Sequence, residues 1–233
     1  GLVIVLLASA TFISPGGVRK AEMGSALTST FTALPAMLGQ SPDSILHLPY
    51  HLLQKLSLAA AKVTLIGIKL PSLLMAVGSM LTMYGLLRLW FRRNVAIIGS
   101  VITLVTGQFL MAAQLGTPSI GYIFWNAAIL YSVSMLARTE KYRSLWLIAA
   151  AALAGFSMYS PLQIYIVIAL LATSIIHPHA RFLVFKLPMW VLGVSVGVFA
   201  IITLSLVILL LSKPHILLTL LGIPHPFALP TLH

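Results

Sequence analysis

Long apolar runs separated by short polar connections make up most of the chain. A transmembrane helix needs about 20 consecutive, mainly apolar residues to cross the hydrocarbon core of a bilayer. By this measure the pattern predicts seven spans, at residues 1–14, 67–89, 94–115, 119–137, 144–159, 161–177 and 186–212. The predicted fold class is therefore all-α, a polytopic membrane protein with about seven transmembrane helices.

Residues 15–66 are the one long segment that is not continuously apolar. Within it, the pattern at Arg19–Phe31 predicts a short amphipathic helix, because Met23, Leu27 and Phe31 recur at four-residue intervals. Ile45–Leu58 predicts a second one, rich in leucine. Both are too short to span, so we expect a first outer loop that holds two helices lying in the membrane interface.

The basic residues predict the orientation. Eight of the fourteen Lys and Arg lie in the three connections after the second, fourth and sixth predicted spans, whereas the turns at 116–119 and 159–161 carry none. Short basic loops are normally cytoplasmic, and the rule weakens in long loops. We therefore expect a cytoplasmic N-terminus, the loop at 15–66 on the outer or lumenal face, and a location in the plasma membrane.

Composition restricts the class of protein further. The chain has 233 residues, of which 60% are hydrophobic and only 7% charged, against about 25% charged in a soluble domain. The net charge of +11 comes from bases that stand singly between apolar runs, not on a polar face with aromatics as in a nucleic-acid binder. Membrane lipids are the expected partners, and nucleic acid is not. The absence of cysteine excludes disulfides and thiolate metal sites.

We expect residues 1–233 to form a single transmembrane domain. The sequence starts at Gly1, inside an apolar run and without an initiator Met. There is no basic region before this run, as a signal peptide would have. We interpret it as the end of a first transmembrane helix, and a longer parent chain stays an open alternative.

Glu22 is the candidate catalytic residue. It is one of three acids in the chain, and it lies on the first interfacial helix, just outside the first predicted span. A carboxylate there suits a general base or a ligand of a divalent cation. The alternative is a solvated carboxylate that pairs with Arg19, three residues earlier.

His47 and His51 are four residues apart, a spacing at which two histidines on a helix can ligate one metal. Pro49 interrupts this spacing, no acid stands beside His47, and no third ligand is evident. We therefore predict no metal site on the histidines, and place them as substrate-binding candidates. The alternative is a pair of histidines at the polar edge of an amphipathic helix.

Lys62 and Lys69 come just before, or at the start of, the second predicted span. A lysine at headgroup depth can bind a lipid-linked phosphate, and the alternative is simple snorkelling to the interface. Gln114 is a further substrate-binding candidate. With Gln108 and Gln163 it falls toward the outer half of the predicted bundle, where polar groups can line a cavity.

Taken in order, these features resemble the N-terminal membrane half of the C-type glycosyltransferases, the superfamily of the protein O-mannosyltransferases and the lipid A aminoarabinose transferases. The resemblance covers nearly the whole chain. It rests on five stretches: Arg-Lys-Ala-Glu-Met at 19–23, His-Leu-Pro-Tyr-His-Leu-Leu at 47–53, Lys-Leu-Pro-Ser at 69–72 with Trp-Phe-Arg-Arg at 90–93, Gln-Leu-Gly-Thr-Pro-Ser at 114–119, and Ser-Pro at 160–161.

The resemblance implies transfer of a sugar from a polyprenyl- or dolichyl-phosphate donor at the outer membrane face, with Glu22 at the family's acidic position. It implies that His47 takes the second polar position and that Lys62 or Lys69 approaches the lipid phosphate. The sugar and the acceptor stay open, as does a divalent cation. Two positions depart from the family pattern: Ala21 replaces the paired acid and Ser119 replaces the acid of a later turn.

These departures keep two other functions open. One is a catalytically inactive scaffold or lipid-binding subunit of the same fold. The other is a transporter, which is disfavoured because no charged residue falls in the middle of a predicted span, where coupling ions usually need one.

Overall fold

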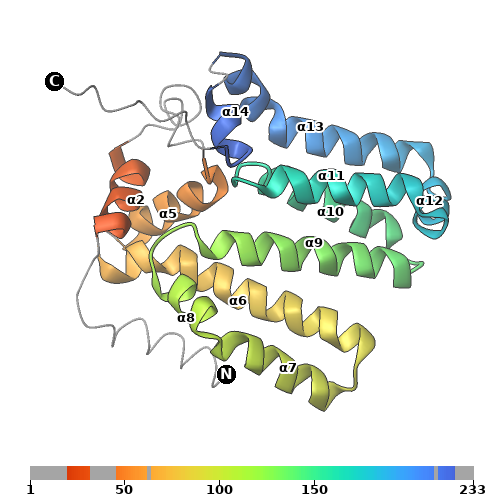
Figure 1. The fold of residues 1–233 in the computed structure, drawn as a ribbon, viewed down its shortest axis with the longest axis horizontal. Coiled ribbons are helices and arrows are strands. Elements are labelled where there is room, and N and C mark those ends of the chain that lie inside the picture. The colour runs from red at the N-terminus through yellow and green to blue at the C-terminus, as the bar shows by residue number, and fades with distance from the viewer. Residues whose placement is uncertain (1–19, 32–45, 62–63, 213–214, 224–233) are drawn as a thin grey trace.

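The computed structural model describes residues 20–31, 46–61, 64–212 and 215–223, and in these it consists of helices without strands (Figure 1). The all-α fold class is thus confirmed. The helices of the described residues are α2 (Lys20–Phe31), α5 (Leu48–Ala61), α6 (Leu65–Trp90), α7 (Arg93–Val105), α8 (Gly107–Gln114), α9 (Ile120–Arg138), α10 (Arg143–Ser157), α11 (Gln163–Ile176), α12 (Pro178–Phe185), α13 (Met189–Ser212) and α14 (His215–Leu220).

Three of these helices, α6, α9 and α13, are long and apolar enough to cross a membrane, and the pair α7 and α8 passes the same test together. Helices α10 and α11 are apolar but shorter. The first predicted span, residues 1–14, lies outside the described residues. The chain is therefore an integral membrane protein, and the count of about seven spans stays a prediction.

The predicted span at 94–115 is not straight, because α7 and α8 meet at an angle of 67°. The break falls at Thr106, whose backbone is extended and whose hydroxyl donates to the Thr103 carbonyl at 2.7 Å. Such a local bond competes with the helical ladder, and Gly107 adds a residue of low helix propensity. The hydropathy pattern predicted one continuous span here, although Thr106, Gly107 and Gln108 interrupt the apolar run.

Helix α12 begins at a proline. Pro178 takes its first position, directly after His177, and the helix continues to Phe185. Proline suits the first helical position, where its missing N–H has no partner to lose and its φ is already helical.

Helix α5 docks on the start of α6 at a point that Pro71 creates. Proline has no N–H, so the carbonyl of Gly67, four residues earlier, loses its helical partner. The Ser57 hydroxyl on α5 donates to that carbonyl at 2.7 Å. The break in the α6 ladder thus becomes an anchor for α5, with both Ser57 and Gly67 buried.

Helix α6 packs along α9 through glycines that leave no room for a side chain. A Cβ at Gly78 would lie 2.6 Å from the Phe124 ring, and one at Gly85 would lie 2.6 Å from the Tyr131 ring. The seven-residue spacing on both helices repeats the contact after two turns. Small residues that allow close approach are typical of helix packing in membranes.

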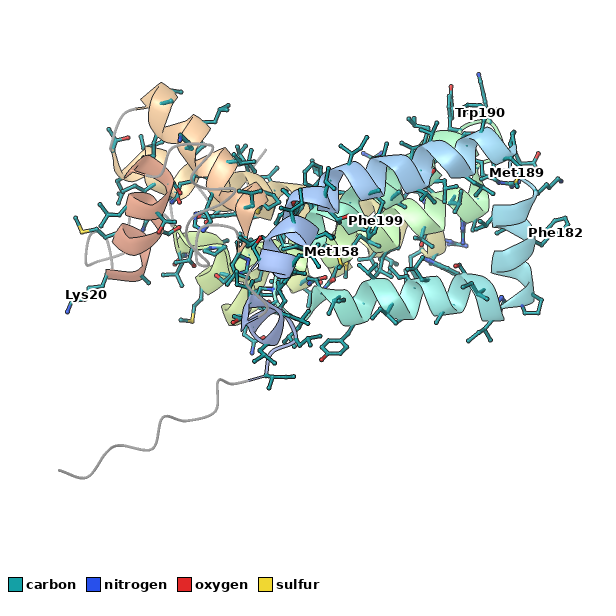
Figure 2. The ribbon with its side chains drawn as sticks, turned by 90° about the horizontal axis from the view of Figure 1, so that it is seen from above. Lys20, Met158, Phe182, Met189, Trp190 and Phe199 are labelled. Carbon is teal, nitrogen blue, oxygen red and sulfur yellow. The ribbon has the colours of Figure 1, made fainter. Side chains whose placement is uncertain are left out.

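The two ends of the bundle differ. The α6–α7 and α9–α10 connections and α12 lie at one end, and α2 and α5 lie at the other (Figure 1). The side chains of Phe182, Met189 and Trp190 project outward at the α12 end (Figure 2), where all three are exposed. All three basic connections that the sequence assigned to the cytoplasm are therefore at the end away from α2 and α5.

Candidate active site

Helix α2 turns its polar side inward. Glu22, Ala26 and Ser29 are buried, with exposed fractions of 1%, 6% and 0%, whereas Met23 and Leu27 are exposed. Spacings of four and three residues put the buried set on one stripe. The predicted apolar stripe of this helix therefore faces out, and the candidate catalytic acid faces the protein.

Glu22 contacts two distant parts of the chain. Its Oε1 accepts a hydrogen bond of 2.9 Å from the backbone N–H of Gly116, in the turn between α8 and α9. The same oxygen lies 3.7 Å from the Lys69 Nζ. A backbone N–H and an ammonium are both strong hydrogen-bond donors to a carboxylate, so the buried acid has a fixed donor and a cation beside it.

Lys69 lies in the second turn of α6 and is buried, with its side chain 8% exposed. The sequence predicted it as a phosphate ligand or a lysine that snorkels to the interface. In the structure its ammonium faces inward, toward Glu22, and its role as a phosphate ligand stays a prediction. A buried lysine beside a buried carboxylate is costly to desolvate unless the two charges are paired.

His51, on α5, contacts a buried serine of α2. Its Nδ1 lies 3.1 Å from the Ser29 Oγ. The Ser29 hydroxyl has one proton, and it also faces two atoms that only accept, the Ser25 carbonyl oxygen at 2.9 Å and the Gln54 Oε1 at 2.7 Å. Nδ1 of His51 is therefore the donor to Ser29. Burial lowers the pKa of His51 to about 4, so the ring is neutral at pH 7.

His47 is not on the helix that carries His51. It precedes α5 with a left-handed backbone, φ 59°. Its N–H donates to the Tyr159 carbonyl at 2.7 Å, and its Nδ1 lies 3.2 Å from the Ser160 Oγ. Burial, and secondarily the charge of His51, lower its pKa to about 4. The two histidines thus bind different partners, although the sequence placed them at one helical spacing.

The other substrate-binding candidates are less tightly placed. Gln114 is partly buried in the last turn of α8, two residues before Gly116. Lys62 lies outside the described residues, as does Arg19, the alternative partner of Glu22. Within the parts of the chain that the structure describes, no group of three or more His, Asp or Glu could hold a metal ion.

Sequence reasoning missed three contributors to this region. Gln54 is fully buried and lies between α2 and α6. Tyr50 bonds the Ser72 hydroxyl at 2.9 Å, and burial raises its pKa. Gly116 supplies the N–H to Glu22. A signal existed for Gln54 alone, because it falls three residues after His51, on the same stripe of α5.

Comparison with known proteins gives the class and then the family. The sequence profile of the dolichyl-phosphate-mannose-protein mannosyltransferase family matches residues 48–219, well over half of the chain. Together with the helical membrane fold, this defines an integral membrane protein of the C-type glycosyltransferase superfamily. The chain belongs to the dolichyl-phosphate-mannose-protein mannosyltransferase family.

Membership in this family points to a membrane glycosyltransferase that uses dolichyl-phosphate sugar donors. Lys69 and Gly116 fall inside the matched range, and Glu22 precedes it. No curated protein and no solved structure matches the sequence in the same comparisons.

Proposed function

We propose that this chain transfers a sugar from a dolichyl-phosphate donor to an acceptor hydroxyl, with Glu22 as the general base and Lys69 as the cation for the donor phosphate. The observation that carries the proposal is the buried pair of the two side chains, at 3.7 Å. A lone acid and a lone lysine are common at membrane surfaces. A buried acid and a buried cation side by side, in a family of lipid-phosphate sugar transferases, match the two charges that such a reaction needs.

The reaction step is a displacement at the anomeric carbon of the sugar. The acceptor hydroxyl gives its proton to the Glu22 carboxylate while its oxygen bonds to the anomeric carbon. The bond from that carbon to the phosphate oxygen breaks, and the dolichyl phosphate leaves with the electron pair. A positioned general base contributes about 10²–10⁴ in rate, and a cation at the leaving phosphate stabilises charge that develops in the transition state.

The Glu22 carboxylate and the donor phosphate compete for the Lys69 ammonium. In the structure Lys69 faces Glu22, so a donor phosphate must share or take over that contact. When it does, the carboxylate gives up part of its contact with the ammonium and is left available to the acceptor hydroxyl. Donor binding and activation of the base are thereby coupled. This coupling gives a direct expectation: Glu22→Gln binds the donor more tightly than the wild type and does not turn it over.

We also propose that the reaction takes place at the outer or lumenal face. The proposal is supported by the arrangement of the bundle, in which α2 and α5 lie at the end opposite the basic connections (Figure 1). Short basic loops are retained on the cytoplasmic side. Protease protection of tags placed in the α9–α10 connection and before α2, in sealed vesicles, tests the orientation.

The remaining candidates take secondary roles in this proposal. Neutral His47 and His51 would offer hydrogen bonds to the substrate rather than charge. Lys62 and Gln114 remain candidates for the donor headgroup. The proposal does not require a divalent cation, because Lys69 already supplies a positive charge at Glu22. Whether a metal also takes part is tested directly. Retention of activity after chelation by EDTA would assign that role to Lys69 alone, and loss with recovery on adding Mg²⁺ or Mn²⁺ would add a metal.

The test is donor binding and sugar transfer in proteoliposomes, with dolichyl-phosphate-mannose as donor and a Ser/Thr-rich peptide as acceptor. We expect saturable binding that falls about tenfold or more in Lys69→Ala, because a charge-assisted contact to phosphate is lost. Lys141→Ala is the matched control, since this exposed lysine lies in the α9–α10 connection. Binding without transfer in any preparation would favour the second function, a lipid-binding subunit without catalysis.

A further inference from the structure

Gln54 is a fully buried amide that contacts three separate elements. Its Oε1 accepts hydrogen bonds from Ser25 at 2.9 Å and from Ser29 at 2.7 Å, both on α2. Its Nε2 faces two backbone carbonyls, that of Ile68 on α6 at 3.3 Å and that of Gly116 before α9 at 3.5 Å. One side chain on α5 thus links the helix that carries Glu22 to the turn that binds it.

Gly116 is held from two sides by this arrangement. Its N–H donates to the Glu22 carboxylate at 2.9 Å, and its carbonyl accepts from Gln54. The glycine itself packs so tightly that a Cβ would lie 2.9 Å from the Ile68 Cγ2 and 3.2 Å from the Ile68 carbonyl oxygen. The backbone of this turn therefore has little freedom, and Gln54 fixes its distance from α2.

We propose that Gln54 is a positioning residue for the transfer reaction, acting on Glu22 through the Gly116 peptide and through α2. The inference rests on the proposed function, because it gives Gln54 a role only if Glu22 is the base. Gln54 does not touch the reacting atoms. It holds the carboxylate and its backbone donor in one geometry, and a misplacement of about 1 Å at a reacting group can cost about 10²-fold in rate.

The chemistry of the contacts requires an amide of this length. Two hydroxyls need an acceptor and two carbonyls need a donor. A glutamate would place a second acceptor against the carbonyls of Ile68 and Gly116, and a methionine would satisfy neither side. An asparagine is one methylene shorter and cannot span the same partners from the same backbone position.

The experiment compares Gln54→Met with Ser57→Ala in the full chain, reconstituted with dolichyl-phosphate-mannose and peptide acceptor. Ser57 is the matched control because it also links α5 to α6, through the Gly67 carbonyl, but has no contact with Gly116 among the described hydrogen bonds. We expect kcat to fall about 10- to 100-fold in Gln54→Met, with the KM for the donor within about twofold of wild type. Ser57→Ala should keep the wild-type kcat.

A spectroscopic readout separates positioning from general loss of structure. Labelling with ¹⁵N-glycine and ¹³C-carbonyl-leucine selects the Leu115–Gly116 bond and three other Leu–Gly bonds of the chain. We expect the Gly116 amide resonance to move in Gln54→Met and in Glu22→Gln but to stay in place in Ser57→Ala. If Gln54→Met does not fold, Ser25→Ala replaces it, with a smaller fall in kcat and the same resonance displaced.

The outcomes are distinguishable. Wild-type kcat and an unmoved Gly116 resonance in Gln54→Met, or in Ser25→Ala where that variant stands in, overturn the positioning role. If Glu22→Gln is inactive at the same time, the proposed function stands without it. If Glu22→Gln keeps the wild-type kcat, the proposed function itself fails, whatever Gln54→Met does.

Discussion

Glu22 and Gly116 are 94 positions apart in the chain, and the carboxylate of the first accepts a hydrogen bond of 2.9 Å from the backbone N–H of the second. The contact joins α2, at one edge of the bundle, to the turn that leads into α9. It gives a buried acid a fixed partner that no side-chain motion can withdraw. The fold itself therefore holds the candidate catalytic group through a contact with a distant part of the chain.

The buried pair of Glu22 and Lys69 should dominate the stability of this region. Lys69→Met leaves the carboxylate buried without the ammonium at 3.7 Å, and we expect a loss of about 3 kcal/mol in the free energy of unfolding. The double variant Glu22→Gln with Lys69→Met should lose less than the sum of the two single changes, because it removes both charges. Unfolding in mixed micelles measures the stability of both single variants and of the double variant. If the two losses simply add, Glu22 and Lys69 do not interact.

A methyl group at position 116 should damage the site without removing any functional side chain. In Gly116→Ala the new Cβ meets the Ile68 backbone carbonyl, which cannot rotate away, so the turn must shift. We expect a destabilisation of about 1–3 kcal/mol and a loss of transfer activity. Gly193→Ala is the control, since nothing lies within 4 Å of its Cβ. That variant should be neutral or slightly more stable, because alanine is the better helix former.

The pH dependence of stability should report His47 and His51. Burial lowers the pKa of His51 from an ordinary value of 6.5 to about 4, and that of His47 to about 4. The unfolded chain therefore binds more protons than the folded one between these values. Stability should be constant above about pH 7 and should fall as the pH drops from 6.5 to 4, by up to roughly 3 kcal/mol for His51.

Unfolding measurements of the wild type and of His51→Asn at several pH values test this sign. In the variant, stability should fall less steeply between pH 6.5 and 4, since asparagine does not titrate in this range. A wild-type stability that rises on acidification would show that the histidines are charged in the fold.

Packing between α6 and α9 offers a test that is independent of function. Gly78→Ala drives a Cβ to 2.6 Å from the Phe124 ring, and overpacking of this kind typically costs about 1–3 kcal/mol. The second change Phe124→Leu removes the ring and should recover part of that loss, so that the pair of substitutions is less harmful than the sum. If Phe124→Leu does not relieve Gly78→Ala, the close approach of the two helices is wrong.

The sequence predicts the helical fold well because hydrophobic periodicity is a local property. The helices α6, α9, α10 and α13 lie where apolar runs predicted spans. At the bend only Thr106, Gly107 and Gln108 interrupt the apolar run, and so short an interruption does not distinguish a bent span from a straight one. Pro178 signals a helix start as readily as a turn, and the choice depends on the residues that follow.

The sequence predicts individual residues of the candidate site but not their arrangement in space. Glu22 and Lys69 could be selected separately because charged residues are rare in this chain. Their pairing could not, because it depends on how α2 packs on α5, and α5 on α6. Gln54 shares a stripe of α5 with His51, but the sequence does not show which groups its amide binds, and the role of Gly116 lies in its backbone. Tertiary packing alone determines these partners.

The most direct test of the account is the single-turnover rate of sugar transfer from dolichyl-phosphate-mannose in Glu22→Gln, compared with Glu140→Gln. Glu140 is the matched control, an exposed acid in the α9–α10 connection at the other end of the bundle. The account predicts a rate about 10²–10⁴ lower in Glu22→Gln, with the donor still bound, and a wild-type rate in Glu140→Gln. A wild-type rate in Glu22→Gln would contradict the central claim that this carboxylate is the base.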